Sequence, residues 1–391
     1  MNEPTAETVT GAETFAEQAR RRAETEREAV EWAIDELESE IDEQGIELEA
    51  LLEYARRSRE SLPDRHDRAY EAMAAAFDVD PAVYEAYVFA YSELCEELAD
   101  GEGRSEKNPK GCTNMLVAPP DSGTPVGVDS ASGGPLVLKN RDIAGRGARP
   151  KSIVEQPPIG DYYGYLTVDT CGTISIFKGV NDRGLVAANT YIDSKRDDVD
   201  PENQLRNGTV IRIVLEECAT VEEARSLLES IPTRQLCGQT LFLADDTNAV
   251  LLEIDPAAER IAVDDAPVVA RTNHFVLSSS TETESSIRRR RRTLSLLEGS
   301  GYPDRDELWT VAQDHENGPG DKSICRHPEP EADEPHAFGQ LTTASAAVFE
   351  GGSPEIEVAM GNPCTGQRTR WSFGDEIPAD LRTGRRWLEQ R

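Results

Sequence analysis

The spacing of hydrophobic residues changes once along the 391-residue chain, and this change limits the fold more than any other feature. Up to about residue 100, apolar side chains recur every three or four positions, which is typical of amphipathic helices. From residue 112 onward, short apolar runs have a period of two, which is typical of β-strands. The sequence therefore predicts an all-helical N-terminal segment followed by a domain in which sheets dominate.

The helical segment carries two narrow apolar stripes and therefore needs a partner surface. One stripe is Val30, Ile34, Leu37 and Ile41, and the other is Tyr84, Tyr87, Val88, Tyr91, Cys95 and Leu98. Asp80 followed by Pro81 has the form of a helix start. Residues 100–111 are polar and contain Gly and Pro, as a linker does. We expect a helical segment over 1–111, with its linker at 100–111, and a second domain over 112–391.

The second domain is predicted to be α+β. The expected strands are 135–139, 163–168, 173–178, 184–192, 240–244, 249–254 and 268–276. The expected helices are 207–219, 221–230 and 284–297, with Thr220 and Glu223 forming the capping pattern of the second. Strands interleaved with a few long helices predict layered sheets covered by helices.

The charge excludes several classes of protein. The chain has 41 basic and 74 acidic residues, a net charge of −33, so its general surface will not bind nucleic acid or an anionic membrane. Only seven of the basic residues are Lys, and an acidic, lysine-poor surface is typical of proteins that stay soluble in concentrated salt. The sequence contains neither an apolar run long enough to span a membrane nor a secretory signal. We expect a cytoplasmic protein of a salt-accumulating, halophilic organism.

The seven cysteines are scattered, without a Cys-x-x-Cys pair. This distribution argues against a disulfide framework and against a zinc site. Cys325-Arg326-His327 contains two metal-ligating residue types, but no neighbouring residue in the sequence completes a ligand set. The expectation is therefore that the chain binds no metal.

One cysteine occupies a distinctive position, because Gly111-Cys112-Thr113 lies where the linker meets the first β segment. A preceding glycine gives the backbone the freedom to bring the thiol onto its own carbonyl. An N-to-S acyl shift followed by hydrolysis would then make Cys112 a new N-terminus. Its α-amine could serve as the base for its own thiol. A buried structural thiol is the alternative interpretation.

Five further motifs follow in order: Lys139-Asn140-Arg141-Asp142, Gly179 to Leu185 with Ala188-Asn189, Arg271-Thr272-Asn273-His274-Phe275, Ser285-Ser286-Ile287-Arg288 and Gly361-Asn362-Pro363-Cys364. In this order the set resembles the acyl-coenzyme A:6-aminopenicillanate (isopenicillin N) acyltransferase family. These are autoproteolytic cysteine enzymes of the N-terminal nucleophile (Ntn) hydrolase superfamily, also classed as peptidase family C45. The resemblance covers roughly residues 112–375. It implies a four-layer αββα sandwich preceded by the helical segment, which stays bound after cleavage as an α subunit.

The resemblance implies a role for each matching residue. Cys112 is the nucleophile, cleavage falls between Gly111 and Cys112, and Asp142 orients the freed amine. Asn189 and Asn273 match the pair that surrounds the oxyanion. Lys139 stands where related hydrolases carry Arg, so either Lys139 or Arg141 accompanies the thiolate. The supporting residues are Thr113, Lys139, Asn140, Arg141, Asn181 in the turn before Asn189, His274, and an Arg of the helix, either Arg288 or Arg289.

The expected reaction is hydrolysis or acyl transfer on a linear, non-peptide amide through an acyl-Cys112 intermediate, without metal or organic cofactor. The partners implied are a small-molecule amide, acyl-coenzyme A as a candidate acyl donor, and the chain's own cleaved N-terminal segment. Two alternatives remain open. One is an unprocessed cysteine hydrolase with His274 as its base. The other is a non-catalytic protein that retains the fold. The asparagines could equally close a buried polar network, and Asp142 could simply pair with Arg141.

Overall fold

The computed structural model describes residues 14–101, 110–118, 133–194, 203–278, 282–300, 302–328 and 338–389. The N-terminal part consists of helices: α1 (Phe15–Gln44), α2 (Glu49–Glu60), α3 (Asp64–Ala74), α4 (Pro81–Phe89) and α5 (Tyr91–Gly101). Thr14 and Glu17 form a capping box at the start of α1, and Asp80 caps α4 with Pro81 at its first position. The prediction of a helical segment is confirmed. Its first 13 residues and most of the predicted linker, 102–109, lie outside the described part of the chain.

Two antiparallel sheets follow. The six-stranded sheet has the order β10-β1-β2-β11-β12-β13, and the seven-stranded sheet runs from β3 to β9 in sequence order. The strands of the first are β1 (Lys110–Val117), β2 (Leu136–Ile143), β10 (Val268–Arg271), β11 (Thr342–Glu350), β12 (Glu355–Met360) and β13 (Thr369–Ser372). Those of the second are β3 (Lys151–Gln156), β4 (Tyr165–Thr170), β5 (Lys178–Asn181), β6 (Val186–Tyr191), β7 (Gln239–Ala244), β8 (Ala249–Asp255) and β9 (Arg260–Asp264).

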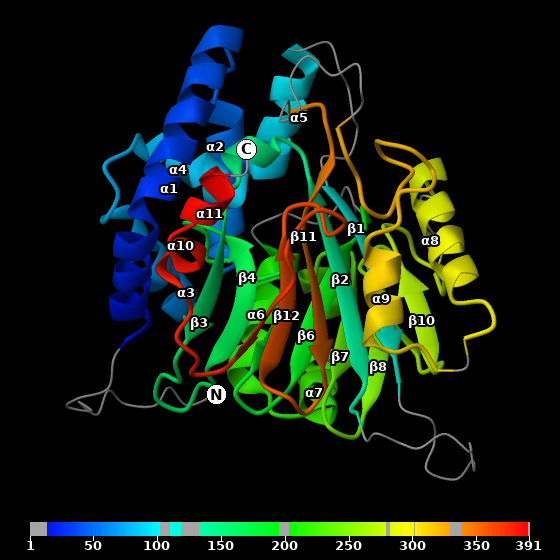
Figure 1. Cartoon of the computed structure of the whole chain (residues 1–391). Helices are drawn as coiled ribbons and strands as arrows, with labels where there is room; N and C mark the ends of the chain where they lie inside the picture. Colours follow the sequence, from blue (N-terminus) through cyan, green and yellow to red (C-terminus); the bar gives the residue numbers. More distant parts are fainter. Residues whose placement is uncertain are drawn as a thin grey trace.

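The sheets pack face to face, and helices cover their outer faces (Figure 1). Apolar residues of both sheets, such as Val137, Phe242 and Phe349, form one buried cluster between them. Helices α6 (Asn207–Glu217) and α7 (Val221–Ser230) pack on the seven-stranded sheet. Helices α8 (Glu284–Leu296) and α9 (Arg305–Ala312) pack on the six-stranded sheet. The short helices α10 (Ala379–Arg382) and α11 (Arg385–Leu388) lie near the C-terminus. The mixed α+β fold predicted from the sequence is confirmed.

The N-terminal helices pack on the sheet domain through a shared core. Both predicted stripes are buried, and their cluster includes Ile143, Cys171 and Trp387 of the domain. Polar contacts reinforce the packing: the hydroxyls of Tyr84 and Tyr87 donate to the carbonyls of Gly172 and Cys171, each over 2.8 Å. The narrow stripes therefore have the partner surface that their width requires.

Two strand predictions need correction. Residues 173–177 form no ladder, because Gly172, at φ +73°, turns the chain. Instead, the amides of Ile176 and Phe177 donate to the Gly208 carbonyl and the Asp169 carboxylate. The strand expected over 268–276 ends at Arg271, where Thr272 and Asn273 turn to bond Ser286 of α8. The predicted linker, 100–111, also extends too far, because β1 begins at Lys110 and includes Gly111. Among the described helices, none is long and apolar enough to cross a membrane.

Candidate active site

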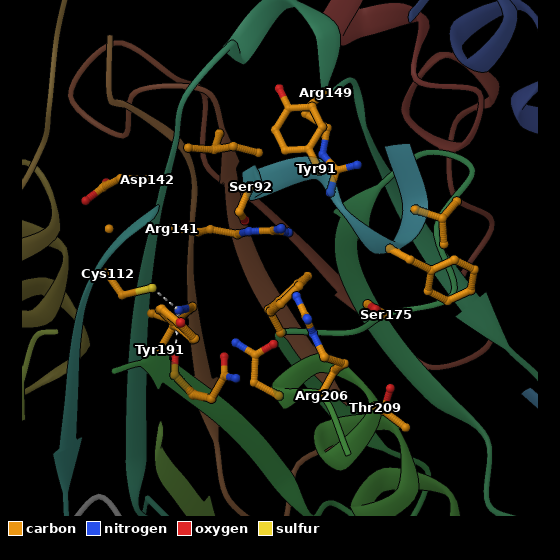
Figure 2. Close-up of a pocket in the computed structure, with 18 of the residues that line it drawn as sticks. Tyr91, Ser92, Cys112, Arg141, Asp142, Arg149, Ser175, Tyr191, Arg206 and Thr209 are labelled. Carbon is orange, nitrogen blue, oxygen red and sulfur yellow. Dashed lines mark hydrogen bonds between the residues drawn. The ribbon is translucent and has the colours of Figure 1, made fainter. Parts of the chain in front are cut away.

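Cys112 lies in β1 with its side chain directed between the two sheets (Figure 2). It pairs with Arg141 of β2, while Gly111 pairs with Asp142. Because side chains alternate along a strand, residues 112 and 111 face opposite sides of the sheet. The Cys112 Sγ atom accepts a 2.8 Å hydrogen bond from Lys139 Nζ, which also donates to the Asn189 carbonyl over 2.5 Å. The cation beside the thiol is therefore Lys139, whereas Arg141 pairs with Asp169.

Burial changes the protonation behaviour of Lys139. Lys139 is almost fully buried, and the loss of solvation lowers the pKa of its ammonium group, an effect that the nearby Cys112 thiol opposes. The thiolate, rather than the thiol, is the nucleophilic form of a cysteine. The Cys112 sulfur and the Lys139 ammonium group thus lie in contact in a space shielded from water.

Asn273 holds the backbone of Cys112. The Cys112 amide donates to Asn273 Oδ1 over 3.0 Å, and Asn273 Nδ2 donates to the Tyr191 carbonyl over 2.9 Å. Arg289 of α8 donates to the same Oδ1 over 2.9 Å, and its guanidinium also bonds the Cys112 carbonyl. Arg288, by contrast, is exposed and pairs with Glu284. Of the two arginines left open by the sequence, Arg289 is the one that reaches the site.

Asp142 lies on the opposite face of β2 from Arg141 and does not pair with it (Figure 2). Its Oδ1 accepts from Thr343 over 2.7 Å, and its Oδ2 lies 3.1 Å from Arg326 Nε. A Cβ atom on Gly111 would lie 2.7 Å from that Oδ2 and 3.0 Å from the Arg326 guanidinium carbon. Gly111 has no positive φ, so its glycine is needed for space beside Asp142 rather than for a strained backbone.

The other predicted residues divide between the site and its surroundings. Asn189 donates from Nδ2 to Gln239 over 3.2 Å, and Thr113 accepts from Arg289 over 3.1 Å. Asn181 Oδ1 accepts from an amide of its own turn, and its Nδ2 donates to two carbonyls at the C-terminal end of α6. Asn140 lies away from the thiol and donates to the Ala312 carbonyl. His274 Nδ1 contacts Ser286 Oγ at 2.6 Å, and no contact joins it to Cys112 within the described structure.

A pocket opens beside the thiol, and both halves of the chain line it (Figure 2). Val88, Phe89, Tyr91 and Ser92 come from the N-terminal helices, whereas Ser175, Phe177, Tyr191 and Thr209 come from the sheet domain. Its charged lining is mainly cationic, with Lys139, Arg141, Arg149 and Arg206 against one acidic residue, Asp142. Arg149 lies between the rings of Tyr87 and Tyr91, and Arg206 lies on Tyr54. In a chain of net charge −33, this pocket is suited to an anionic group.

Sequence patterns assigned no role to Arg326 or Thr343, the two partners of Asp142. Arg326 is almost fully buried and follows Cys325, so its one available signal was a basic residue inside a Cys-x-His pattern. The contacts depend on distant segments of the chain, which periodicity does not connect.

The family model of acyl-coenzyme A:6-aminopenicillanic acid acyl-transferase matches residues 130–333, just over half of the chain. The matched range includes Lys139, Asp142, Asn189, Asn273 and Arg289, whereas Cys112 precedes it. No curated protein matches the chain in sequence.

Three solved structures are similar at low identity. Penicillin V acylase from Agrobacterium tumefaciens is 13% identical, with a TM-score of 0.42, over 67% of this chain and 86% of the other. The Caenorhabditis elegans ortholog of N-acylethanolamine-hydrolyzing acid amidase is 14% identical, with a TM-score of 0.41, over 68% and 100%. A mutant of the conjugated bile acid hydrolase from Clostridium perfringens is 10% identical, with a TM-score of 0.40, over 67% and 97%.

Proposed function

Because the chain belongs to the acyl-coenzyme A:6-aminopenicillanic acid acyl-transferase family of Ntn hydrolases, we propose that it cleaves itself before Cys112 and then acts on linear amides. The observation that carries this proposal is the Cys112 thiol, which faces the pocket 2.8 Å from Lys139 Nζ while Asn273 holds its amide at 3.0 Å. The helix–sheet–sheet–helix layers agree with the αββα sandwich of that superfamily.

Self-cleavage would begin with attack of the Cys112 sulfur on the Gly111 carbonyl carbon. The C–N bond breaks as the C–S bond forms, the amine takes a proton, and water hydrolyses the resulting thioester. The products are a carboxylate on Gly111 and an α-amine on Cys112. Asp142 lies beside Gly111, so its carboxylate can hold the new ammonium group. The 1–111 segment would remain as the α subunit, because its core and its tyrosine hydrogen bonds do not depend on the broken peptide.

In the proposed reaction, the Cys112 thiolate attacks the substrate carbonyl, and Lys139 stabilises the thiolate before attack. Asn189 and Asn273 supply amide donors for the oxyanion. The α-amine passes a proton to the leaving amine, and the acyl group stays on sulfur. Water then takes the acyl group if the protein is a hydrolase, and a second amine takes it if the protein is an N-acyltransferase. Acyl-coenzyme A is a candidate acyl donor to the same thiol.

The cationic lining supports amide substrates that carry a carboxylate, such as N-acyl amino acids. Arg206 is the most useful probe, because the only hydrogen bond of its guanidinium within the described residues is a 3.3 Å contact with Ser58. We expect Arg206→Gln to raise KM for N-phenylacetylglycine about tenfold and to leave the neutral N-phenylacetylglycinamide unchanged.

The experiment that tests the function is covalent trapping. The purified protein is incubated with each amide and with phenylacetyl-coenzyme A. The reaction is then quenched in acid, and the masses of the protein fragments are measured by mass spectrometry. The proposal expects a phenylacetyl adduct on the fragment that begins at Cys112, and none in Cys112→Ala. A folded, processed protein that forms no adduct and releases no amine from any of the three compounds would contradict it.

A further inference from the structure

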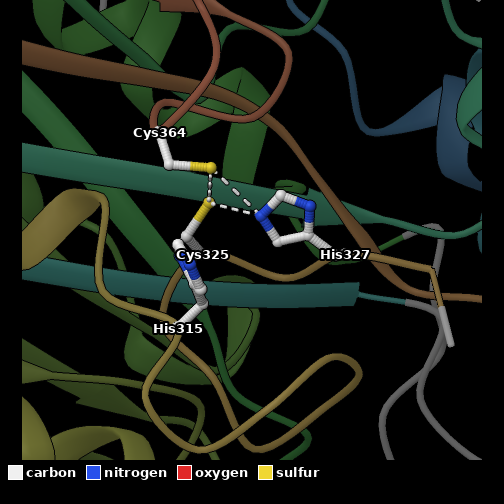
Figure 3. A group of neighbouring side chains, drawn as sticks. All are labelled: His315, Cys325, His327 and Cys364. Atoms are coloured by element: carbon white, nitrogen blue, oxygen red, sulfur yellow. Dashed lines mark hydrogen bonds between the residues drawn. The ribbon is translucent and has the colours of Figure 1, made fainter. Parts of the chain in front are cut away.

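Four metal-ligating side chains converge at a second place, remote from the thiol of Cys112 in the sequence and outside the mechanism above. His315, Cys325, His327 and Cys364 bring one potential ligand atom each, and these atoms all lie within 4.8 Å of one another (Figure 3). His315 follows α9, Cys325 and His327 belong to the loop after it, and Cys364 follows β12. The expectation that nothing completes a ligand set around Cys325 is therefore wrong.

We propose that these four residues form a structural zinc site of the Cys2His2 type. Tetrahedral zinc with Zn–S bonds of about 2.3 Å and Zn–N bonds of about 2.0–2.1 Å separates two sulfurs by roughly 3.8 Å, and a sulfur from a nitrogen by roughly 3.6 Å. Here the two Sγ atoms are 3.7 Å apart, and Cys325 Sγ lies 3.5 Å from His327 Nε2. Cys364 Sγ lies 3.1 Å from the same nitrogen. The sulfurs are too far apart for a disulfide, and both thiols are free.

The surroundings orient the ligands as a metal site requires. His315 Nδ1 lies 2.9 Å from the Gln313 carbonyl, which selects the tautomer with its proton on Nδ1 and leaves Nε2 free to bind a metal. Asn362 Nδ2 lies 3.7 Å from Cys325 Sγ, as an amide that supports a thiolate does. Cys325 is fully buried, whereas His315 is exposed, so the site has both a firm anchor and an entry path.

The site would connect two segments that support the nucleophile. Arg326 lies between the ligands Cys325 and His327 in this loop, and its guanidinium reaches Asp142. The fourth ligand, Cys364, follows Asn362, which bonds the Arg326 carbonyl over 2.5 Å. A bound zinc ion would thus fix the loop that places Arg326 against Asp142. This role is structural, and its test does not depend on the reaction proposed above.

The test is the zinc content of the full chain, purified under reducing conditions and freed of loose metal by desalting. We expect about one zinc per chain in the wild type and in Cys237→Ser, a half-buried cysteine outside the cluster. The zinc content of Cys325→Ser and of Cys364→Ser should each be about tenfold lower than that of the wild type, while the helical circular dichroism signal is retained. Cobalt added to the metal-free wild type should give the ligand-field bands of a tetrahedral site and thiolate-to-cobalt charge transfer, both absent from Cys364→Ser.

Three results would overturn the proposal. In the first, the wild type binds no zinc, and added cobalt gives none of these bands. In the second, both cysteine variants keep zinc at full stoichiometry. In the third, the mass of the wild-type chain is lower by two protons, which would reveal a Cys325–Cys364 disulfide. Because each measurement reads the metal or the thiols directly, none depends on self-cleavage or on amide hydrolysis.

Discussion

Lys139 Nζ lies 2.8 Å from Cys112 Sγ, and both side chains are buried between the two sheets. Lys139 is therefore the donor in contact with the proposed nucleophile, so its protonation state bears on the proposed reaction. This contact and its neighbours determine how substitutions and pH should change the protein.

Replacing Lys139 should change the pH profile of the processed enzyme. Burial lowers the pKa of Lys139, so as pH rises the ammonium loses its proton sooner than an exposed lysine would, and the thiolate loses its donor. The wild-type kcat/KM should therefore fall as the pH becomes alkaline, with a midpoint below ~10.4, the pKa of an exposed lysine. Lys139→Arg should retain partial activity without that fall, because arginine stays protonated. Lys139→Met should lose activity at least about tenfold at every pH. An alkaline fall that persists in Lys139→Arg would assign it to another group.

Removing the Asn273 side chain should slow both amide turnover and self-cleavage. The variant Asn273→Ala loses the acceptor of the Cys112 amide and the proposed oxyanion donor. Loss of one such donor costs about 2.7–4 kcal/mol, so kcat should drop about 10²- to 10³-fold. Asn248→Ala, in the exposed turn between β7 and β8, is the matched control and should leave kcat unchanged. Equal kcat values for the two variants would exclude Asn273 from the reaction.

Adding a single methyl group at position 111 should impair self-cleavage. The new Cβ of Gly111→Ala would lie 2.7 Å from Asp142 Oδ2 and 3.0 Å from the Arg326 guanidinium, so a buried ion pair must move. We expect an intact chain, or cleavage slowed at least about tenfold, with melting within a few degrees of the wild type. The measurement is the fraction of cleaved chain against time. Cleavage at the wild-type rate would show that the close approach has no bearing on the reaction.

Acid should weaken the attachment of the helical segment. His66 of α3 and Glu216 of α6 lie 2.7 Å apart and are almost fully buried. Burial, together with the Arg212 charge, lowers the pKa of His66 to about 4. In the unfolded chain, histidine titrates near pH ~6.5. Between these two pH values the unfolded chain binds more protons than the folded chain. The contribution of His66 to the free energy of unfolding is therefore fully present above pH ~6.5 and is lost, by up to about 3 kcal/mol, as the pH falls towards ~4.

The pKa of Glu216 changes stability in a lower range. Burial would raise this pKa, but Arg212 and His66 lower it overall, so its contribution is present above about pH 4.3 and is lost below that value. Urea unfolding at several pH values measures both effects. In His66→Gln, the stability should change little between about pH 6.5 and 4.5. A slope equal to that of the wild type would place the titrating group elsewhere.

Local patterns predicted most of the fold because local physics determines it. The 3.6-residue stripe that includes Val30 and Ile34 is buried as expected, and Thr220 caps α7 through the Glu223 amide. The segment 173–177 was wrongly predicted as a strand, because the Asp169 carboxylate, eight residues before Phe177, takes an amide that a ladder would have used. Strands such as β11 were missed because a fully buried strand lacks the alternation that marks a half-buried one.

The residues of the candidate site could be proposed from the sequence, but their pairings could not. The spacing of Lys139 and Asp142 is a sequence property, yet the two side chains lie on opposite faces of β2 and act on different neighbours. The choice of Arg289 over Arg288 depends on which face of α8 meets β1, which a run of five arginines conceals. The cluster of His315 and Cys364 with Cys325 joins residues up to 49 positions apart, beyond the reach of any local motif.

Whether Cys112 becomes an N-terminal nucleophile is decided by the intact mass of the purified protein under denaturing conditions. Cleavage before Cys112 divides the 391 residues into 111 and 280, which correspond to about 12 and 31 kDa of the 43.0 kDa chain. We expect these two masses from a single co-eluting species purified in molar salt, and one uncleaved mass from Cys112→Ala. A folded wild-type chain that remains at 43.0 kDa would show that Cys112 is not released as an N-terminus.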